Sequence, residues 1–290
     1  MKYLQQRSPF GLLLVGFILC SFLSACKKPR PAEPAQPCLL STLTFSRQID
    51  TPALTLDGSL TTTIGSSGTQ ITGLSFTNEL VSYKGRYNFD GNGLPTSFDE
   101  IDESGKVLQK DLATFSYEQD PTGKYRLKTY RQVSYFNRFL VNVNWSFTYD
   151  SNGLIKYVYD QERQMWYTLE TSSAGNVVTT RHTTWTGNTP GMASIPTSAA
   201  TFTTKENPFL IIPLPIRLHL FYLTQSAYYH TPLNFEQILS RNLIDTYTMG
   251  NPAYNSAETF THTGTGWQSS VDNFYGKGKF SLQYTLRCQN

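Results

Sequence analysis

The sequence predicts an all-β fold: an antiparallel hairpin-repeat meander that forms a curled sheet or an open barrel, with one short helix near 233–242. Three observations support this. The chain contains 18 Tyr and 18 Phe but only 16% charged residues, a balance that suits pleated sheets better than helices. Apolar and polar residues alternate along many short segments, and glycine-containing turn signals separate those segments. No second linker interrupts this pattern, so residues 38–290 are expected to form a single β domain.

The start of the chain differs from the rest and predicts an export signal. Positively charged Lys2 and Arg7 precede an apolar core that is too short for a comfortable membrane span. The stretch that ends this core, Leu23-Ser24-Ala25-Cys26, is similar to the lipobox of bacterial lipoproteins. That resemblance implies that residues 1–25 are a lipoprotein signal peptide and that Cys26 becomes acylated. The alternative is an ordinary secretory signal cut after Ala25, which would leave Cys26 as a spare thiol.

Residues 26–37, the lipidated cysteine and a proline-rich stretch, form the predicted tether. They contain four prolines and no apolar residue larger than alanine or proline apart from Cys26. An extended spacer of roughly 35 Å is therefore expected, at ~3.1 Å per residue. Acyl chains hold a protein on a bilayer without a spanning helix, at roughly 0.8 kcal/mol per buried methylene. Lys27 and Lys28 differ from the aspartate of an inner-membrane retention signal and from the acidic residues that send some lipoproteins to the cell surface. The outer membrane is the expected location, with its periplasmic face favoured.

Alternation is clearest in residues 139–150, where Val143, Trp145 and Phe147 are separated by Asn and Ser. This pattern is typical of a half-buried antiparallel strand. Rougher alternation predicts strands at 79–89, 107–118, 124–136, 154–160, 164–170, 176–185, 256–262 and 279–288.

The turn signals between these strands contain glycine after Asp, Asn or Ser, as short hairpin loops require. Two hairpins match closely, at 87–98 and 147–158, and share the pattern aromatic-x-aromatic-Asp-x-Asn-Gly-Leu. In each, the carboxylate is expected to accept turn amides and fix the reversal. Calcium is the alternative, but it needs about six to eight clustered oxygen ligands and each turn offers few, so no metal is expected. The turn residues are Asp90, Asn92, Gly93, Asp150, Asn152 and Gly153.

Cysteine use predicts one disulfide. Cys20 leaves with the signal and Cys26 is acylated, so Cys38 and Cys288 remain at the two ends of the folded part. In an oxidising compartment such an isolated pair favours a bridge, which would stabilise the fold by roughly 4–5 kcal/mol in the chain-entropy model. The alternative is two buried, inert thiols.

The segment NPFLIIPLPIRLHLFY, at 207–222, is the most apolar part of the mature chain. Its three prolines are expected to exclude a continuous helix, so we expect buried extended chain that covers the open side or edge of the sheet. Alternatively it lines an apolar pocket or a partner-docking surface. The one predicted helix comes after it, near 233–242, with Thr231 or Asn234 as N-cap and Phe235, Ile238 and Leu239 on one face.

Several classes of function lack support. Loss of residues 1–25 lowers the formal net charge from +3 by two, to +1, which gives no electrostatic basis for binding nucleic acid. The four histidines have no metal-ligand spacing, and no phosphate loop, dinucleotide fingerprint, zinc spacing or nucleophile elbow is present. The acids Asp99, Glu100, Asp102 and Glu103 are expected at a solvated hairpin tip. No catalytic residue and no cofactor are predicted.

The matched hairpins resemble the Tyr-Asp repeats of bacterial surface and secreted proteins. With the lipobox and spacer, the whole arrangement resembles an uncharacterised family of bacterial lipoproteins that carries a domain of unknown function. The counterpart of that family's Asn-Pro-Phe segment is Asn207-Pro208-Phe209, and LSRN at 239–242 resembles the family's short helical stretch after that segment. The resemblance covers most of residues 38–290 and implies no activity.

Together these features predict a lipid-anchored binding or structural module of the cell envelope, whose ligand is a glycan or an envelope protein. The alternative is an envelope hydrolase acting on glycan, which would need two carboxylates flanking the bond that is cut. Solvent-exposed, coplanar Trp and Tyr would favour sugar binding, and an uncovered sheet edge would favour a protein partner. A cleft with two facing carboxylates would favour the enzyme.

Overall fold

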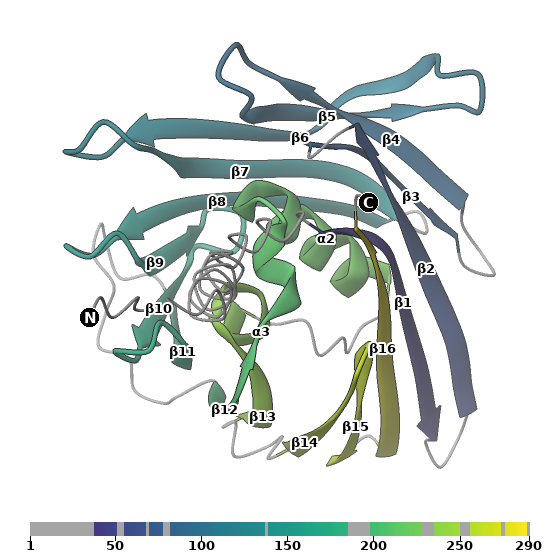
Figure 1. Cartoon of the computed structure of the whole chain (residues 1–290), viewed down its shortest axis with the longest axis vertical. Helices are drawn as coiled ribbons and strands as arrows, with labels where there is room; N and C mark the ends of the chain where they lie inside the picture. The colour runs from purple at the N-terminus through teal and green to yellow at the C-terminus, as the bar shows by residue number, and fades with distance from the viewer. Residues whose placement is uncertain are drawn as a thin grey trace, which may run out of the picture. The chain divides into compact units, whose positions relative to one another are not determined.

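The computed structural model describes residues 38–50, 55–67, 70–77, 82–136, 139–184, 198–227, 235–249, 256–273 and 276–288. Residues 38–288 form one compact unit, in which strands surround helices (Figure 1). The predicted signal peptide, Cys26 and the tether lie outside the described residues, as do the N-cap candidates Thr231 and Asn234.

Sixteen strands pair antiparallel with their sequence neighbours, and the first also pairs with the last, so the sheet closes into a barrel. The predicted all-β antiparallel meander is confirmed, and its closure goes beyond the curled sheet or open barrel expected. The strands are β1 (Cys38–Asp50), β2 (Thr55–Ser67), β3 (Gln70–Thr77), β4 (Ser82–Phe89), β5 (Pro95–Ile101), β6 (Val107–Gln119), β7 (Tyr125–Phe136), β8 (Phe139–Tyr149), β9 (Ile155–Asp160), β10 (Met165–Thr171), β11 (Val177–Thr184), β12 (Ser198–Glu206), β13 (Asn242–Met249), β14 (Ser256–Thr263), β15 (Gly266–Asn273) and β16 (Gly276–Cys288).

Five hairpin turns share one hydrogen-bonded form, at 90–94, 102–106, 120–124, 150–154 and 172–176. In each, the first residue's N–H donates to the carbonyl of the fifth, and the N–H of the fourth donates to the carbonyl of the first. The fourth residue is always glycine, with φ between 77° and 85°. Glycine is needed there because a side chain is strained at positive φ.

Alternate connections lie at opposite ends of the barrel, because antiparallel strands reverse direction at every turn. The number of strands before a turn therefore decides at which end of the barrel that turn lies. The turns 90–94, 120–124 and 150–154 directly succeed β4, β6 and β8, so they lie at the end where β1 begins and β16 finishes. The turn 172–176 succeeds β10 and lies there too. We call this the Cys38 end. The turn at 102–106 succeeds β5 and lies at the opposite end.

Between β12 and β13 the chain forms η1 (Pro208–Ile211), α2 (Leu214–Ala227) and α3 (Phe235–Leu239). The short helix predicted near 233–242 is confirmed as α3. The prediction of extended chain for 207–222 is wrong, because its prolines stand where helices begin. Pro208 opens η1, and Pro215 lies in the first turn of α2, where an N–H has no intrahelical partner to lose.

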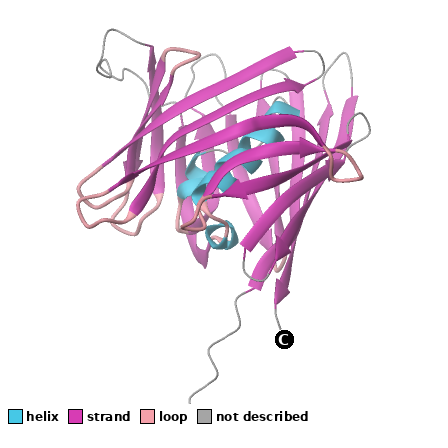
Figure 2. Cartoon of the chain, turned by 90° about the horizontal axis from the view of Figure 1, so that it is seen from above, coloured by secondary structure: helices cyan, strands magenta, loops and turns pink. Residues whose placement is uncertain are grey.

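Both α helices lie within the ring of strands (Figure 2). His219 of α2 is fully buried, and its ring meets that of Phe98 at 4.5 Å between centroids. The Tyr87 hydroxyl lies 2.8 Å from Nδ1 of His219. Burial lowers the pKa of His219 to about 3, so the ring is neutral and can accept this bond. In α3, Phe235 packs against Trp145 at 5.4 Å between ring centroids. These contacts identify the inner face of the wall.

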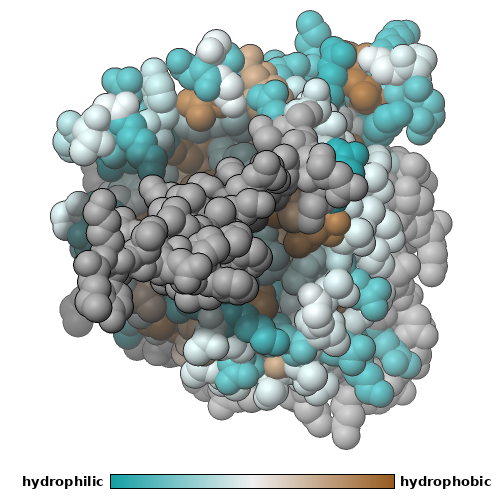
Figure 3. Space-filling view, viewed as in Figure 1, coloured by the Kyte–Doolittle hydropathy of each residue, from teal (hydrophilic) through white to brown (hydrophobic). Residues whose placement is uncertain are grey.

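The two faces of the wall differ in polarity. On the inner face, Leu43, Phe260, Trp267 and Leu282 are buried. On the outer face of β1, β2 and β14 to β16, the described side chains are polar and half or fully exposed: Thr44, Ser46, Gln48, Thr61, Thr63, Thr259, Thr261, Thr263, Gln268, Ser270, Lys279, Ser281, Gln283 and Thr285. Most described residues visible in Figure 3 are teal or white, with brown ones in small separate groups.

Helices cannot cross a membrane in the part of the chain that the structure describes, since none is both long enough and apolar enough.

Candidate binding cavity at the Cys38 end

A cavity of about 440 Å³ opens at the Cys38 end, between the tips of three hairpins and the start of α2. Its volume is within the usual range for small-ligand sites. Tyrosine, leucine and proline predominate in its lining, with a few polar groups. The lining residues are Leu94, Pro95, Tyr117, Asp120, Lys124, Tyr125, Arg126, Leu127, Tyr149, Asn152, Gly153, Pro213, Leu214 and Pro215.

Two of the lining tyrosines are held by bonds to backbone carbonyls. Tyr117 donates its hydroxyl to Pro95 O at 2.7 Å, and Tyr149 donates to Leu127 O at 2.6 Å. Each bond spans two strands, so it fixes the ring relative to the neighbouring hairpin. Burial raises the pKa of both phenols, which therefore stay protonated as donors. The polar ends of these side chains are occupied, and their rings are left to line the cavity.

Arg126 places a planar cation at the cavity wall. Its guanidinium lies 4.6 Å from the centroid of the Tyr149 ring and 2.7 Å from Glu118 Oε1. The side chains of Arg126 and Glu118 are 29% and 33% exposed, so water screens the pair only in part. The guanidinium therefore covers one side of the Tyr149 ring, and its N–H groups that do not face Glu118 are held in place as donors at the cavity wall.

Asp120 is the only carboxylate among the residues that line this cavity. Its Oδ1 accepts from Thr122 Oγ1 at 2.7 Å, Thr122 N at 2.8 Å and Lys124 N at 3.0 Å. These bonds, that of the Thr122 hydroxyl foremost, lower the pKa of Asp120. Its carboxylate is used by its own turn, so the cavity does not offer two facing acids for glycoside cleavage.

The two matched turns lie at the same end. Asp90 Oδ1 accepts from the amides of Asn92 and Leu94, each at 2.9 Å. Asp150 Oδ1 accepts from Asn152 N at 2.8 Å and Leu154 N at 2.9 Å. Leu94 of the first turn and Asn152 and Gly153 of the second line the cavity. Of the six predicted turn residues, Asn152 and Gly153 line the cavity, and the carboxylates of Asp90 and Asp150 are directed at turn amides.

The Asn-Pro-Phe segment ties the helices to the barrel. Buried Asn207 accepts from Phe209 N through Oδ1 at 3.0 Å, and its Nδ2 donates to Gln237 O at 2.6 Å and Ser240 O at 2.9 Å. The Phe209 ring is buried, 6.3 Å from that of Tyr284 on β16. Asn207 thus begins η1 and satisfies carbonyls at the end of α3. The apolar segment after it lines the cavity with Pro213, Leu214 and Pro215.

The remaining predicted sites are placed by register alone. Cys38 lies directly opposite Cys288 in the β1–β16 ladder, the arrangement that the predicted disulfide requires. Within the described ranges, no group of three or more His, Cys, Asp or Glu could hold a metal ion.

Tyr117, Tyr125, Tyr149 and Arg126 are site residues that the sequence analysis did not identify. A signal for one was present: Tyr149 is the second aromatic residue of the matched pattern, directly before Asp150. An aromatic residue in that position ends an even-numbered strand on its inner face, at the Cys38 end. Recognising it required the strand count.

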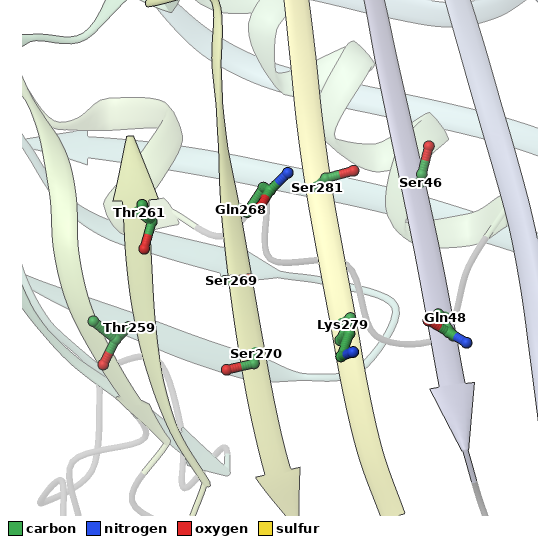
Figure 4. Close-up of a pocket in the computed structure, with 9 residues that line it drawn as sticks. All are labelled: Ser46, Gln48, Thr259, Thr261, Gln268, Ser269, Ser270, Lys279 and Ser281. Carbon is green, nitrogen blue, oxygen red and sulfur yellow. The ribbon is translucent and has the colours of Figure 1, made fainter. Parts of the chain in front are cut away.

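Two features of the outer face are weaker candidates. A shallow polar hollow of about 550 Å³ lies over β14, β15, β16 and β1, lined by hydroxyls, Gln48, Gln268 and Lys279 (Figure 4). Separately, Trp166 on β10 lies 4.6 Å from Tyr159 on β9 between ring centroids, tilted by 30°, with Tyr157 edge-on at 6.1 Å. These half-buried rings pack on one another and are not coplanar.

Comparisons with known proteins give a distant likeness of fold only. No family model matches the chain, and no curated protein matches it. A porin-like protein from Bacteroides uniformis is 14% identical over 88% of this chain and 99% of that one, with a TM-score of 0.39. The TcdB2–TccC3–Cdc42 structure is 12% identical over 84% of this chain and 16% of that one, with a TM-score of 0.26. Likeness this low carries no argument about function.

Proposed function

We propose that this chain is a lipid-anchored module of the cell envelope whose barrel stands in water and binds a glycan in the cavity at the Cys38 end. The observation that carries the proposal is the lining of that cavity, which combines three tyrosines with a small set of polar groups. Aromatic faces suit the apolar faces of sugar rings, while Arg126, Lys124 and Asn152 can bond to hydroxyls.

The wall supports a barrel in water. Membrane-spanning barrels carry an apolar outer band and, in porins, a polar interior. Here the packed apolar side chains face inward, and the outer side chains that the structure describes on five neighbouring strands are mostly Ser, Thr, Gln and Lys. A hydroxyl-rich outer wall would be poorly solvated in hydrocarbon.

The other candidate ligands have less support. A protein partner that adds a strand needs an unpaired edge, and the described strands form a closed ring. A glycan hydrolase of the usual kind needs two carboxylates about 5–10 Å apart, and the cavity lining contains one.

The anchor is tested by Cys26→Ser. We expect the variant to lack the acyl mass and to leave the membrane fraction after a high-salt wash. A variant that still sediments after this wash would refute the anchor.

The predicted oxidising location is tested by the cysteines. The denatured protein should show no reactive thiol at Cys38 or Cys288 before reduction and two after it, because the register brings these residues together. Two thiols before reduction would refute the bridge.

Glycan binding is tested with the full chain in mild detergent on a glycan array. Tyr125, 43% exposed at the cavity, is the residue to change. We expect Tyr125→Ala to weaken binding about 3- to 10-fold through loss of stacking. Tyr157→Ala, a tyrosine of the outer face, is the matched control and should bind as the wild type does. No bound glycan, or an equal loss in the control, would contradict the assignment of the cavity.

A further inference from the structure

The Cys38 end carries most of the exposed large apolar side chains. Six such residues are more than a third exposed in the described part of the chain, and five lie at this end. They are Tyr125 (43%), Leu154 (38%), Leu210 (39%), Ile211 (42%) and Leu286 (41%). The sixth, Leu108 (59%), is the second residue of β6, at the opposite end. The described outer face of β1, β2 and β14 to β16 is polar, and the half-buried rings on β9 and β10 pack on one another, so these five exposed apolar side chains form a rim at the Cys38 end.

The rim residues come from four separate places: the start of β7, the turn 150–154, η1 and the end of β16. Apolar side chains spread around an opening can contact a flat surface together, whereas a groove would bring them into one line. In η1 the direction of the side chains is fixed, because Asn207 caps the helix and buried Phe209 holds its inner side. Leu210 and Ile211 are thereby kept exposed.

The predicted anchor is attached at this same end. β1 begins at Cys38, directly after the tether, and a spacer of residues 26–37 reaches roughly 35 Å at most in polyproline geometry. A lipid on Cys26 would therefore confine the Cys38 end to within that reach of the bilayer, and it places no such limit on the end that carries Leu108.

Charge at the rim is mixed. Lys124, Lys205 and Arg287 are exposed at this end, and so are the acidic turns that contain Asp90, Asp120 and Asp150. Contact with a membrane would therefore depend on apolar insertion rather than on attraction to anionic lipid.

We infer that the Cys38 end is a membrane-docking surface, in which Leu210, Ile211, Leu154, Tyr125 and Leu286 enter the interfacial layer of the bilayer. The inference rests on the lipid anchor of the proposed function. Its consequence is that the cavity opens toward the lipid surface, so the glycan it takes is one displayed there, such as the head group of a glycolipid.

The first experiment measures depth in the acylated full chain. An environment-sensitive fluorescent amino acid replaces Ile211 in one protein and Leu108 in the matched control, and each is reconstituted into neutral phosphatidylcholine vesicles. We expect the probe at 211 to shift to the blue and to be quenched by lipids carrying a nitroxide, equally at low and high salt. The probe at 108 should report water. If both probes report water while mass spectrometry shows acylated Cys26, the docking surface is refuted and the anchor stands.

The second experiment removes the anchor. The Cys26→Ser chain should float weakly with the same neutral vesicles, and adding Leu210→Asp and Ile211→Asp should weaken that binding at least about tenfold, since each change opposes burial. Leu108→Asp in the same background is the control and should change nothing. Equal loss in the control, or binding that needs anionic lipid and disappears in high salt, would overturn the inference.

Discussion

The inner and outer faces of the barrel wall are built by the same strands, one residue apart, and they obey opposite rules. On β15, Trp267 is buried against Phe260 at 5.0 Å between ring centroids, while the next residue, Gln268, is exposed. Inner-face side chains contribute most of the free energy of unfolding, because each packs against neighbours on several sides. The outer face contributes solvation. The fold therefore tolerates change according to which side of the wall a position faces, more than where it lies in the chain.

Polar groups inside the barrel test this rule, and each of three buried acids there has a hydrogen-bond or ion-pair partner. Glu258 accepts from the Ser269 hydroxyl on the next strand, and Glu236 of α3 accepts from the Ser198 hydroxyl on β12. Asp160 is fully buried and pairs with Arg163 Nη1 at 2.6 Å. Buried polar groups are tolerated when they are hydrogen-bonded. Burial raises the pKa of Glu258 and of Glu236, so these two residues make the stability of the barrel interior depend on pH.

The largest expected effect is at the centre of the inner face. Phe98 is fully buried between Tyr87 and His219. Phe98→Ala should lower the free energy of unfolding by about 3–5 kcal/mol through the cavity left behind. Thr261→Ala on the outer face should change it by less than about 0.5 kcal/mol. Urea unfolding of both variants measures the contrast, and equal losses would break it.

The next effect is pH dependence from Glu258. Burial raises its pKa from 4.5 to about 7, with the Ser269 bond acting against this shift. Between those values the folded protein holds a proton that the unfolded chain releases, so stability should fall as pH rises from 4.5 to 7 and then level off. The full fall from this group is about 3 kcal/mol.

Glu258→Gln should remove that part of the slope, measured by urea unfolding at a series of pH values. Glu236, whose pKa burial also raises, keeps a residual slope of the same sign. A slope unchanged by the substitution would show that Glu258 is not titrating in the folded wall.

A smaller effect is expected at the turns, which belong to neither face. Asp90→Ala or Asp150→Ala should lower Tm by about 2–4 °C through loss of the turn bonds, and Asn should restore much of it, because its oxygen accepts the same amides. Chelator should leave the wild-type Tm unchanged. A fall in chelator that calcium reverses would mean that these turns bind the ion.

The smallest effect is on the outer face itself. Thr259→Val with Thr261→Val should leave the free energy of unfolding within about 0.5 kcal/mol of wild type, because both positions are exposed on a strand that favours β-branched residues. Size-exclusion chromatography should instead show more self-association, as the polar wall becomes apolar there. A large loss of stability would show that the outer hydroxyls are structural.

Strands with a strong aromatic alternation could be predicted from the sequence, and β4, β6 to β11, β14 and β16 confirm it. The strands β1, β2, β3, β12, β13 and β15 were not predicted. Many of their outer residues are Ser or Thr, which give a weak contrast in hydropathy. Of the four acids predicted at a solvated hairpin tip, Asp102 and Glu103 lie in the turn 102–106, whereas Asp99 and Glu100 belong to β5. There Asp99 is buried, accepting from Asp111 N at 2.9 Å and Asn88 Nδ2 at 2.9 Å, partners that lie on neighbouring strands.

The cavity could be predicted only in part. The matched turns and the apolar segment were recognised separately, and pocket lining was an alternative for the second. What unites them is the strand count, which places every second turn at one end. A local pattern carries no information about how many strands separate two motifs. Because Pro208, Pro213 and Pro215 were interpreted as helix breakers, α2 was not predicted. The start of α2 completes the wall of the cavity.

Because the number of strands is even, the chain enters and leaves the barrel at the same end, which makes circular permutation possible. The first residue of β1 and the last of β16 are register partners, so a short linker could join them with little movement of the backbone. New termini cut into the turn at 102–106 would then emerge from the opposite end. In a circular permutant of this kind, with the lipobox and spacer placed before Val107, the anchor would be attached at the end of the barrel opposite the cavity. The wall and the cavity would keep the same residues. Such a permutant would change the orientation of the barrel relative to its anchor and leave the order of strands around the barrel unchanged.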